Sequence, residues 1–273
     1  MKKLAIIIYI IITAAGCVKK TDWPVSGNSP NLIVVDGIIT DERKSQSIRI
    51  TLPVSVLNAS PLPVIGADVL ISNEDSTWQL IENPLEPGSY QTDSSFLAIL
   101  GKRYTLLIYL DDQVYSAKAY MVPGSAFGEL QYLKDPDSDL FYIDWVANAF
   151  SYQDPAMWEI NLDWSMVPGY ENMNPSDCRT RMLFYTLPTL DVSQIFAPEM
   201  EKILFPAGTI INERRYSITP EHAEFLREML LETNWTGGLY SLANANVMTN
   251  LSTGAIGYFG ACSVTSLSLT VIP

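Results

Sequence analysis

Short apolar segments separated by polar turns recur through the first half of the chain, and this spacing restricts the fold more than any other feature. Residues 31–40 (NLIVVDGIIT) have the apolar run of a buried strand, and residues 47–52 (SIRITL) alternate apolar and polar side chains. Further strand-like segments, paired around polar turns, follow at 67–72, 77–82, 103–110 and 113–120. This pattern predicts an Ig-like or transthyretin-like β-sandwich of about seven strands over roughly 90 residues. We place this domain at residues 31–122.

The β pattern continues after a turn-rich junction at residues 123–140. The clearest strand of the chain lies in MWEINLDWS, where apolar and polar residues alternate. Its apolar face consists of Trp158, Ile160, Leu162 and Trp164. The closing segment, GAIGYFGACSVTSLSLTVI, predicts two apolar strands separated at or near Gly260. We therefore expect residues 123–273 to form a second, β-rich domain.

One main α-helix is predicted in this second domain, at residues 220–233. Thr219 can cap the first amides, Pro220 suits the first helical position, and Glu221 complements the positive end of the helix. An apolar stripe expected to pack on the sheet follows, made of Phe225, Leu226, Met229 and Leu230. The predicted fold class is thus mainly β with one main helix.

The first 16 residues have the layout of a secretory signal peptide. Lys2 and Lys3 precede an apolar run that is too short for an ordinary transmembrane helix, and small residues lead up to Cys17. A cysteine in this place is typical of a bacterial lipoprotein signal, in which its sulfur carries a diacylglyceryl group with fatty acids such as palmitate and the cysteine becomes the first mature residue. An ordinary secreted protein and a retained helical anchor are the alternatives. Residues 17–30 are polar and are expected to act as a tether.

The chain is acidic, with a formal net charge of −13. Removal of Lys2 and Lys3 with the signal segment would take the charge to about −15. An acidic surface repels phosphate backbones, so we expect no nucleic-acid partner. Outside a reducing compartment, Cys178 and Cys262 can form a disulfide or remain as two buried thiols, and the sequence does not decide between them.

Few residues of the chain suggest catalysis. The single histidine, His222, lies in the first turn of the predicted helix without metal-ligand neighbours, and we interpret it as a solvated residue. No GxSxG motif accompanies it, which argues against serine-hydrolase chemistry. Glu159 and Asp163 are the best candidates for a carboxylate pair. No cofactor is expected.

Two weaker site predictions fall on turns. Asp135, Asp137 and Asp139 alternate along the chain as the oxygen ligands of Ca²⁺ can do, but the spacing then departs from a calcium-binding loop. Ser76 lies in the sequence Asp-Ser-Thr, which resembles a short O-glycosylation site of Bacteroidota.

Several segments together resemble one family. They are LIVVDGIITDE, PVIGADVLIS, PGSYQT, GKRYTLLI and GGLYSLANANVMTNLSTGAIGYFGACSV. They are similar to the domain-of-unknown-function family 4249 of Bacteroidota lipoproteins, and the resemblance extends over nearly all of the mature chain. It implies an outer-membrane lipoprotein, often encoded beside a TonB-dependent receptor, and it supplies no catalytic residues. The periplasmic or cell-surface face stays open, because CVKKTD lacks the acidic run of surface-exported lipoproteins.

Three functions follow as hypotheses. The first is a non-enzymatic accessory lipoprotein, anchored through Cys17, that assists a TonB-dependent transporter by binding the transporter or its substrate. The second is a surface glycan-binding or adhesion module, with stacking platforms among Trp145, Trp158, Trp164 and Trp235. The third is a carboxylate-dependent glycoside hydrolase, which needs two acidic residues facing each other in a cleft.

Overall fold

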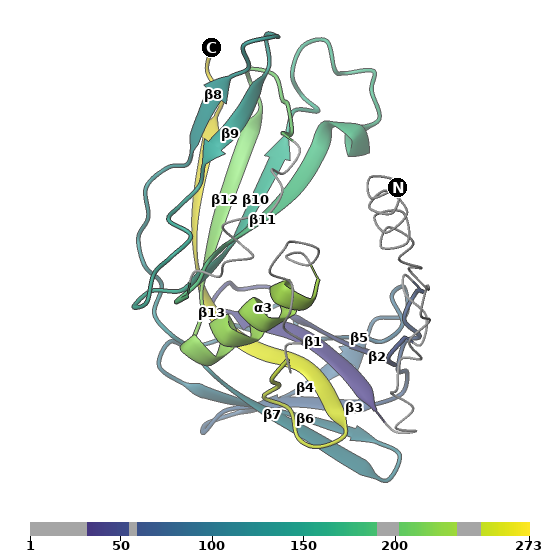
Figure 1. Cartoon of the computed structure of the whole chain (residues 1–273). Coiled ribbons are helices and arrows are strands. Elements are labelled where there is room, and N and C mark those ends of the chain that lie inside the picture. The colour runs from purple at the N-terminus through teal and green to yellow at the C-terminus, as the bar shows by residue number, and fades with distance from the viewer. Residues whose placement is uncertain (1–31, 55–58, 190–201, 234–246) are drawn as a thin grey trace, which may run out of the picture.

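The computed structural model describes residues 32–54, 59–189, 202–233 and 247–273. Within these ranges the chain is mainly β, with one α-helix and one 3₁₀ helix, as the sequence predicts. Figure 1 shows two β bodies joined end to end, with the helix α3 where they meet. We call them the N-terminal sandwich and the C-terminal sheet.

Seven strands and the first half of the last strand form the N-terminal sandwich. The seven are β1 (Ile33–Thr40), β2 (Ser47–Thr51), β3 (Asp68–Ser72), β4 (Thr77–Glu82), β5 (Ser89–Gln91), β6 (Arg103–Leu110) and β7 (Gln113–Tyr120). They pair in the order β1-β2-β5-β4-β3-β6-β7, so the sheet can turn back on itself between β5 and β4. A bridge between Ala117 and Leu251 then brings β7 to the segment that precedes β13. The two layers therefore enclose a core.

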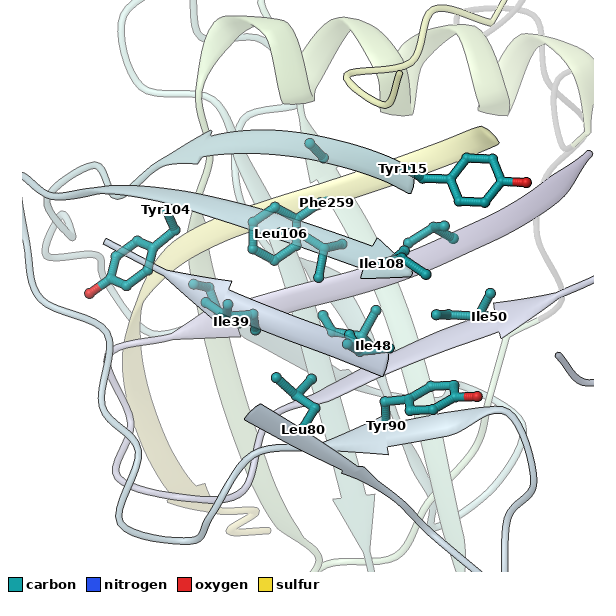
Figure 2. Packing of buried hydrophobic residues seen from close by; sticks show 14 of the residues in the cluster. Ile39, Ile48, Ile50, Leu80, Tyr90, Tyr104, Leu106, Ile108, Tyr115 and Phe259 are labelled. Atoms are coloured by element: carbon teal, nitrogen blue, oxygen red, sulfur yellow. The ribbon is translucent and has the colours of Figure 1, made fainter. Parts of the chain in front are cut away.

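The core of the sandwich is apolar because alternate residues of each strand point inward. Ile48 and Ile50 of β2, and Leu106 and Ile108 of β6, have no exposed surface. Figure 2 shows these side chains gathered with Phe259 of the last strand between the layers. The period-two pattern of the sequence is thus confirmed in these strands.

The C-terminal sheet is antiparallel, with the order β11-β10-β12-β13. Its elements are β10 (Ala156–Asp163), the 3₁₀ helix η1 (Pro175–Cys178), β11 (Arg179–Thr186), β12 (Ile210–Ser217) and β13 (Ala255–Thr270). The hairpin of β8 (Gln131–Lys134) and β9 (Phe141–Trp145) contributes to the core on one face, with Phe141 bridged to Phe205. The inward residues of β10 are those expected, since Trp158, Ile160 and Leu162 are buried there.

The strand β13 belongs to both bodies. Its first half pairs in parallel with β1, from Ile33 opposite Ala255 to Thr40 opposite Cys262, and its second half pairs antiparallel with β12. Asp41 accepts a hydrogen bond from Val264 N at 2.8 Å where the strand leaves β1. The sandwich therefore includes residues from far beyond 31–122.

The prediction of two closing strands separated near Gly260 is wrong, because residues 255–270 form one strand. The unusual backbone lies instead at Gly257, whose φ is 101° and where a Cβ would stand 2.0 Å from Val35 O. Gly260 has another role, since a Cβ there would lie 2.7 Å from His222 Cε1. Its missing side chain makes room for the helix.

The helix α3 (Pro220–Glu232) confirms the prediction to within one residue. The Thr219 side chain caps it by accepting a hydrogen bond from His222 N, and Pro220 takes the first position. Leu226 and Leu230 are buried against β12 and β13 residues at the junction of the bodies. The described part of the chain contains no helix with the length and apolarity needed to cross a membrane.

Candidate functional site

Charged residues lie on the face of the C-terminal sheet that carries α3. In the antiparallel register, Glu159 of β10 stands opposite Arg214 of β12, and Asn161 stands opposite Arg181 of β11. Directly opposite residues of paired strands share a face, so these side chains come together. The polar half of the β10 alternation therefore builds an ionic surface.

An ion-pair chain runs from this face to the loop between β1 and β2. Arg181 binds Glu159 at 2.6 Å, and Arg214 binds the other Glu159 oxygen at 3.1 Å. Arg214 also binds Glu42 at 2.5 Å, and Lys44 binds Glu42 at 2.6 Å. The chain of five alternating charges thus ties the sandwich to the C-terminal sheet.

The electrostatics keep these carboxylates ionised. Burial alone would raise the pKa of Glu159, but hydrogen bonds from Asn161 and Arg181 and the charges of Arg181 and Arg214 outweigh burial and lower the pKa. The pKa of Glu42 is also lowered, because the effects of Lys44 and Arg214 outweigh the effect of burial, which would raise it. Neither group is suited to act as a general acid at neutral pH.

A cleft of about 400 Å³ opens above this chain. It is lined from the sandwich by residues of β1 and β2 with the loop between them, and from the C-terminal sheet by Met157, Glu159, Arg181 and Tyr216. The Arg181 and Lys44 side chains are 59% and 43% exposed, so each can donate to a ligand oxygen. The arrangement favours binding of a polar ligand by charged hydrogen bonds.

The predicted carboxylate pair does not meet. Glu159 and Asp163 are four residues apart on one strand, which places their backbones about 13 Å apart. Glycoside hydrolases need their two carboxyl groups within about 5–10 Å. Asp163 is in turn held by Arg179 at 2.8 Å. Both acids are occupied in cross-strand ion pairs.

His222 is buried rather than solvated, which corrects the sequence interpretation. It is 3% exposed, because it packs against Gly260 and stacks on Tyr258 with ring centroids 4.4 Å apart. Burial lowers its pKa to about 4. Cys262 Sγ lies 3.9 Å from His222 Nδ1, and burial raises the pKa of this thiol. Neutral imidazole next to a protonated thiol makes a packing contact and not an activated nucleophile.

Cys178 and Cys262, the cysteines of the described ranges, are both free and buried. Cys178 belongs to the core between the C-terminal sheet and the β8–β9 hairpin, and Cys262 belongs to the cluster under α3. Of the two alternatives, a disulfide or two buried thiols, the structure shows the two buried thiols. The fold places the two thiols in different clusters, where each fills space as a small apolar group.

A second cleft, of about 260 Å³, lies on the C-terminal sheet beside Trp145 and Phe150. Trp145 is 40% exposed and Phe150 is 48% exposed. Trp158 and Trp164 are in contrast 4% and 9% exposed, so they serve the core. Trp145 is the tryptophan among these three that can offer a ring face to a ligand.

The turn predictions fall on hairpins. Asp135 accepts from Ser138 Oγ at 2.8 Å and Asp139 pairs with Lys134 at 2.6 Å, between β8 and β9. Within the described ranges, no three His, Cys, Asp or Glu side chains gather closely enough to hold a metal ion, so these aspartates form no Ca²⁺ ligand set. Ser76 lies exposed in the turn between β3 and β4, where its N–H is bound by Asn73.

One buried acid was not anticipated from the sequence. Glu213 on β12 is 1% exposed, accepts one hydrogen bond from Leu130 N at 3.4 Å, and has no partner for its other oxygen. Burial raises its pKa to about 7, and the nearby charge of Glu129 adds to this. The signal lay in IINERRYS, where charged residues occupy a strand with the length of a core strand. Arg214 of the ion-pair chain comes from the same segment.

Cys17, the tether at residues 17–30 and Trp235 lie outside the described residues. The family model described as "Domain of unknown function (DUF4249)" matches residues 19–268. No curated protein matches the chain significantly.

Proposed function

The chain belongs to the DUF4249 family, and on that premise we propose that it is an outer-membrane-anchored accessory lipoprotein, non-enzymatic, that assists a TonB-dependent transporter. Its anchor is the acylated Cys17, and its task is to bind the transporter or the transported substrate. The face of the membrane, periplasmic or cell-surface, is left to experiment.

The cleft over the ion-pair chain is the observation that carries this proposal. Glu159, which lines the cleft, is paired with Arg181 and Arg214, and this pairing fits recognition better than acid–base chemistry. The cleft draws on both bodies, and β13 links them as one backbone. A ligand held there would contact both bodies of a connected scaffold.

The test is purification from native membranes after mild crosslinking. We expect the wild-type chain in the membrane fraction, with an intact mass that includes acyl chains, and crosslinked to a large β-barrel transporter. The Cys17→Ser variant should leave the membrane fraction. Recovery of the lipidated chain alone after crosslinking would contradict the accessory role.

A second crosslinking sample tests the cleft. Charge reversal of its exposed donor, Arg181→Glu, should reduce transporter or substrate recovery at least several-fold. The matched control is Arg103→Glu, an exposed arginine on β6 of the sandwich. Equal recovery from both variants would place the binding surface elsewhere.

Trp145 supports a second candidate function, that of a glycan-binding module. Its exposed ring lies with Phe150 at the cleft of about 260 Å³, where the Asp154 side chain, 46% exposed, supplies polar groups. Sugars stack on such rings and bond to such groups. Calorimetry with oligosaccharides should show binding that Trp145→Ala removes, and the absence of heat with a broad oligosaccharide panel would dispose of this candidate.

A further inference from the structure

One end of the N-terminal sandwich carries a group of exposed aliphatic side chains. They lie on the loop that follows β2 and on the turn that follows β4. We call them the apolar rim, which consists of Leu52, Val54, Leu62, Ile65 and Leu85. Leu62, Ile65 and Leu85 are 66%, 64% and 93% exposed. A single exposed leucine is ordinary, but a group of five on neighbouring loops points to an interaction surface.

Hydrogen bonds hold the two loops side by side. Leu52 N donates to Leu62 O at 2.8 Å, which closes the first loop at its base. The carboxylate of Glu82 accepts from Gly66 N at 2.9 Å and from Gly88 N at 3.0 Å. One side chain thus ties the end of the loop to the end of the turn, and the rim is one surface.

The loop after β2, which carries four of the five rim residues, has no charged residue. Residues 52–66 contain no Asp, Glu, Lys, Arg or His, in a chain of net charge −13. The turn after β4 does carry a charged residue, Glu86, and its carboxylate lies 3.9 Å from the guanidinium of Arg49, which has the opposite charge. The loop would therefore lose few charge–water interactions on entering an apolar medium, and moving charges out of water is the main cost of such a transfer.

The position of the rim relates it to the N-terminal segment. β1 begins at Ile33 and β2 runs antiparallel to it, so Leu52 emerges beside Ile33. Both residues line one cleft of about 370 Å³. The C-terminal sheet is connected at the opposite end of β1, beyond Thr40. The rim and the start of the fold share one end of the sandwich, and the other body lies past the other end (Figure 1).

We propose that the apolar rim inserts into the acyl-chain boundary of the bilayer that holds the lipid on Cys17. This inference rests on the lipid anchor of the proposed function. The 16 peptide units from Cys17 to Ile33 span at most about 55 Å, so the anchor holds this end of the sandwich within that distance of the lipid, close enough for the rim to reach the bilayer. The insertion orients the molecule, with the C-terminal sheet and its clefts directed away from the lipid.

The composition of the rim favours lipid over a protein partner. It consists of Leu, Ile and Val, whereas the centres of protein interfaces are enriched in Tyr, Trp and Arg. Asp111 and Asp112 lie at its edge, in the β6–β7 turn that shares the cleft with Leu52. These acids oppose anionic headgroups, so the surface fits a zwitterionic bilayer.

The test uses the lipidated chain in vesicles of phosphatidylethanolamine and phosphatidylcholine. Leu62→Cys and, as the matched control, Leu133→Cys on β8 each receive an environment-sensitive fluorophore, while the buried Cys178 and Cys262 stay unlabelled. We expect a blue shift and quenching by spin-labelled lipid at position 62 and neither at position 133. Equal exposure of both labels to water, or a crosslink from position 62 to a transporter in place of quenching, would overturn the proposal.

A second measurement separates the rim from the anchor. Intact mass reports acylation of Cys17, whose absence would remove the anchor and leave the rim to be judged by itself. Unlipidated Cys17→Ser chain is then floated with the same vesicles. Combined Leu62→Asn, Ile65→Asn and Leu85→Asn should lower its partition by about tenfold. The control, Leu133→Asn with Leu183→Asn and Met166→Asn, should change it little, and an equal loss would contradict insertion by the rim.

Discussion

The N-terminal sandwich and the C-terminal sheet bury different kinds of polar groups. In the described ranges, the buried polar residues of the sandwich and its loops are neutral, namely Thr40, Gln46, Thr51, Ser89 and Thr92. The C-terminal sheet and its helix bury Glu159, Glu213, Arg215 and His222. A buried charge lowers stability unless it is paired with an opposite charge or with hydrogen bonds. The buried acidic and basic side chains of the described ranges thus belong to the C-terminal sheet and its helix, and the buried polar side chains of the sandwich are neutral.

Removal of a sandwich core ring should give the largest effect. Phe259 has no exposed surface and lies in the sandwich core on β13. Phe259→Ala should lower the free energy of unfolding by about 4 kcal/mol, through lost transfer energy and a cavity. Urea unfolding followed by tryptophan fluorescence measures it. Of the four tryptophans in the described ranges, three belong to the other body, so one shared transition that moves to lower urea shows that β13 couples the two.

The control for this experiment lies on the same strand. Ile256 is 41% exposed, and Ile256→Ala should change stability by less than about 1 kcal/mol. If Phe259→Ala instead produces two separate transitions, the bodies unfold independently and the contrast between them is one of separate domains.

Loss of Arg214, the central arginine of the ion-pair chain, should have the next largest effect on the free energy of unfolding. Arg214→Met leaves Glu159 and Glu42 each with one cation in place of two, and should cost about 2–3 kcal/mol at neutral pH. The folded pKa of Glu159 is lowered, so its contribution is present above the unfolded pKa of about 4.5 and is lost as the pH falls through the folded pKa. The difference between variant and wild type should therefore shrink on acidification.

Arg179→Met is the matched control for this prediction. It breaks a cross-strand pair with Asp163 whose two side chains are 58% and 34% exposed, and should cost less than about 1 kcal/mol. Equal costs for the two variants, measured by urea unfolding between pH 4 and 8, would show that burial does not distinguish the ion-pair chain from surface pairs.

The parts that the sequence predicts are those with local signals. The alternation in β10, the Thr219 cap and the extent of α3 depend on residues within a few positions of each other, and all three are confirmed. The pair of Glu42 and Arg214 joins residues 172 apart in the chain, so no window of sequence contains it. The same holds for His222, whose burial depends on the missing side chain of Gly260. Long-range register decides such contacts.

The buried acid gives a pH dependence of the opposite sign. The folded pKa of Glu213 is raised from 4.5 to about 7, so the folded state binds this proton more tightly than the unfolded state. The free energy of unfolding should fall as the pH rises from about 4.5 to 7, by about 3 kcal/mol, and then stay level. Glu213→Gln should abolish this component, as measured by urea unfolding along a pH series. An unchanged pH slope in the variant would assign it to another group.

The smallest expected effect concerns the thiols of Cys178 and Cys262. They sharpen the comparison of the two bodies because one thiol lies in the C-terminal sheet and the other lies at the junction. In a chain with Cys17→Ser, we expect neither Cys178 nor Cys262 to react with a thiol reagent when folded, both to react in denaturant, and the thermal midpoint to stay unchanged by reductant. Cys178 lies in the core of the C-terminal sheet, and Cys262 lies where β13 passes from one body to the other. If β13 makes the two bodies one unit, slow labelling through opening should proceed at similar rates at both positions. Faster labelling of Cys178 would mean that the C-terminal sheet, with its buried charged residues, opens while the junction stays closed. The C-terminal sheet would then be the less stable of the two bodies.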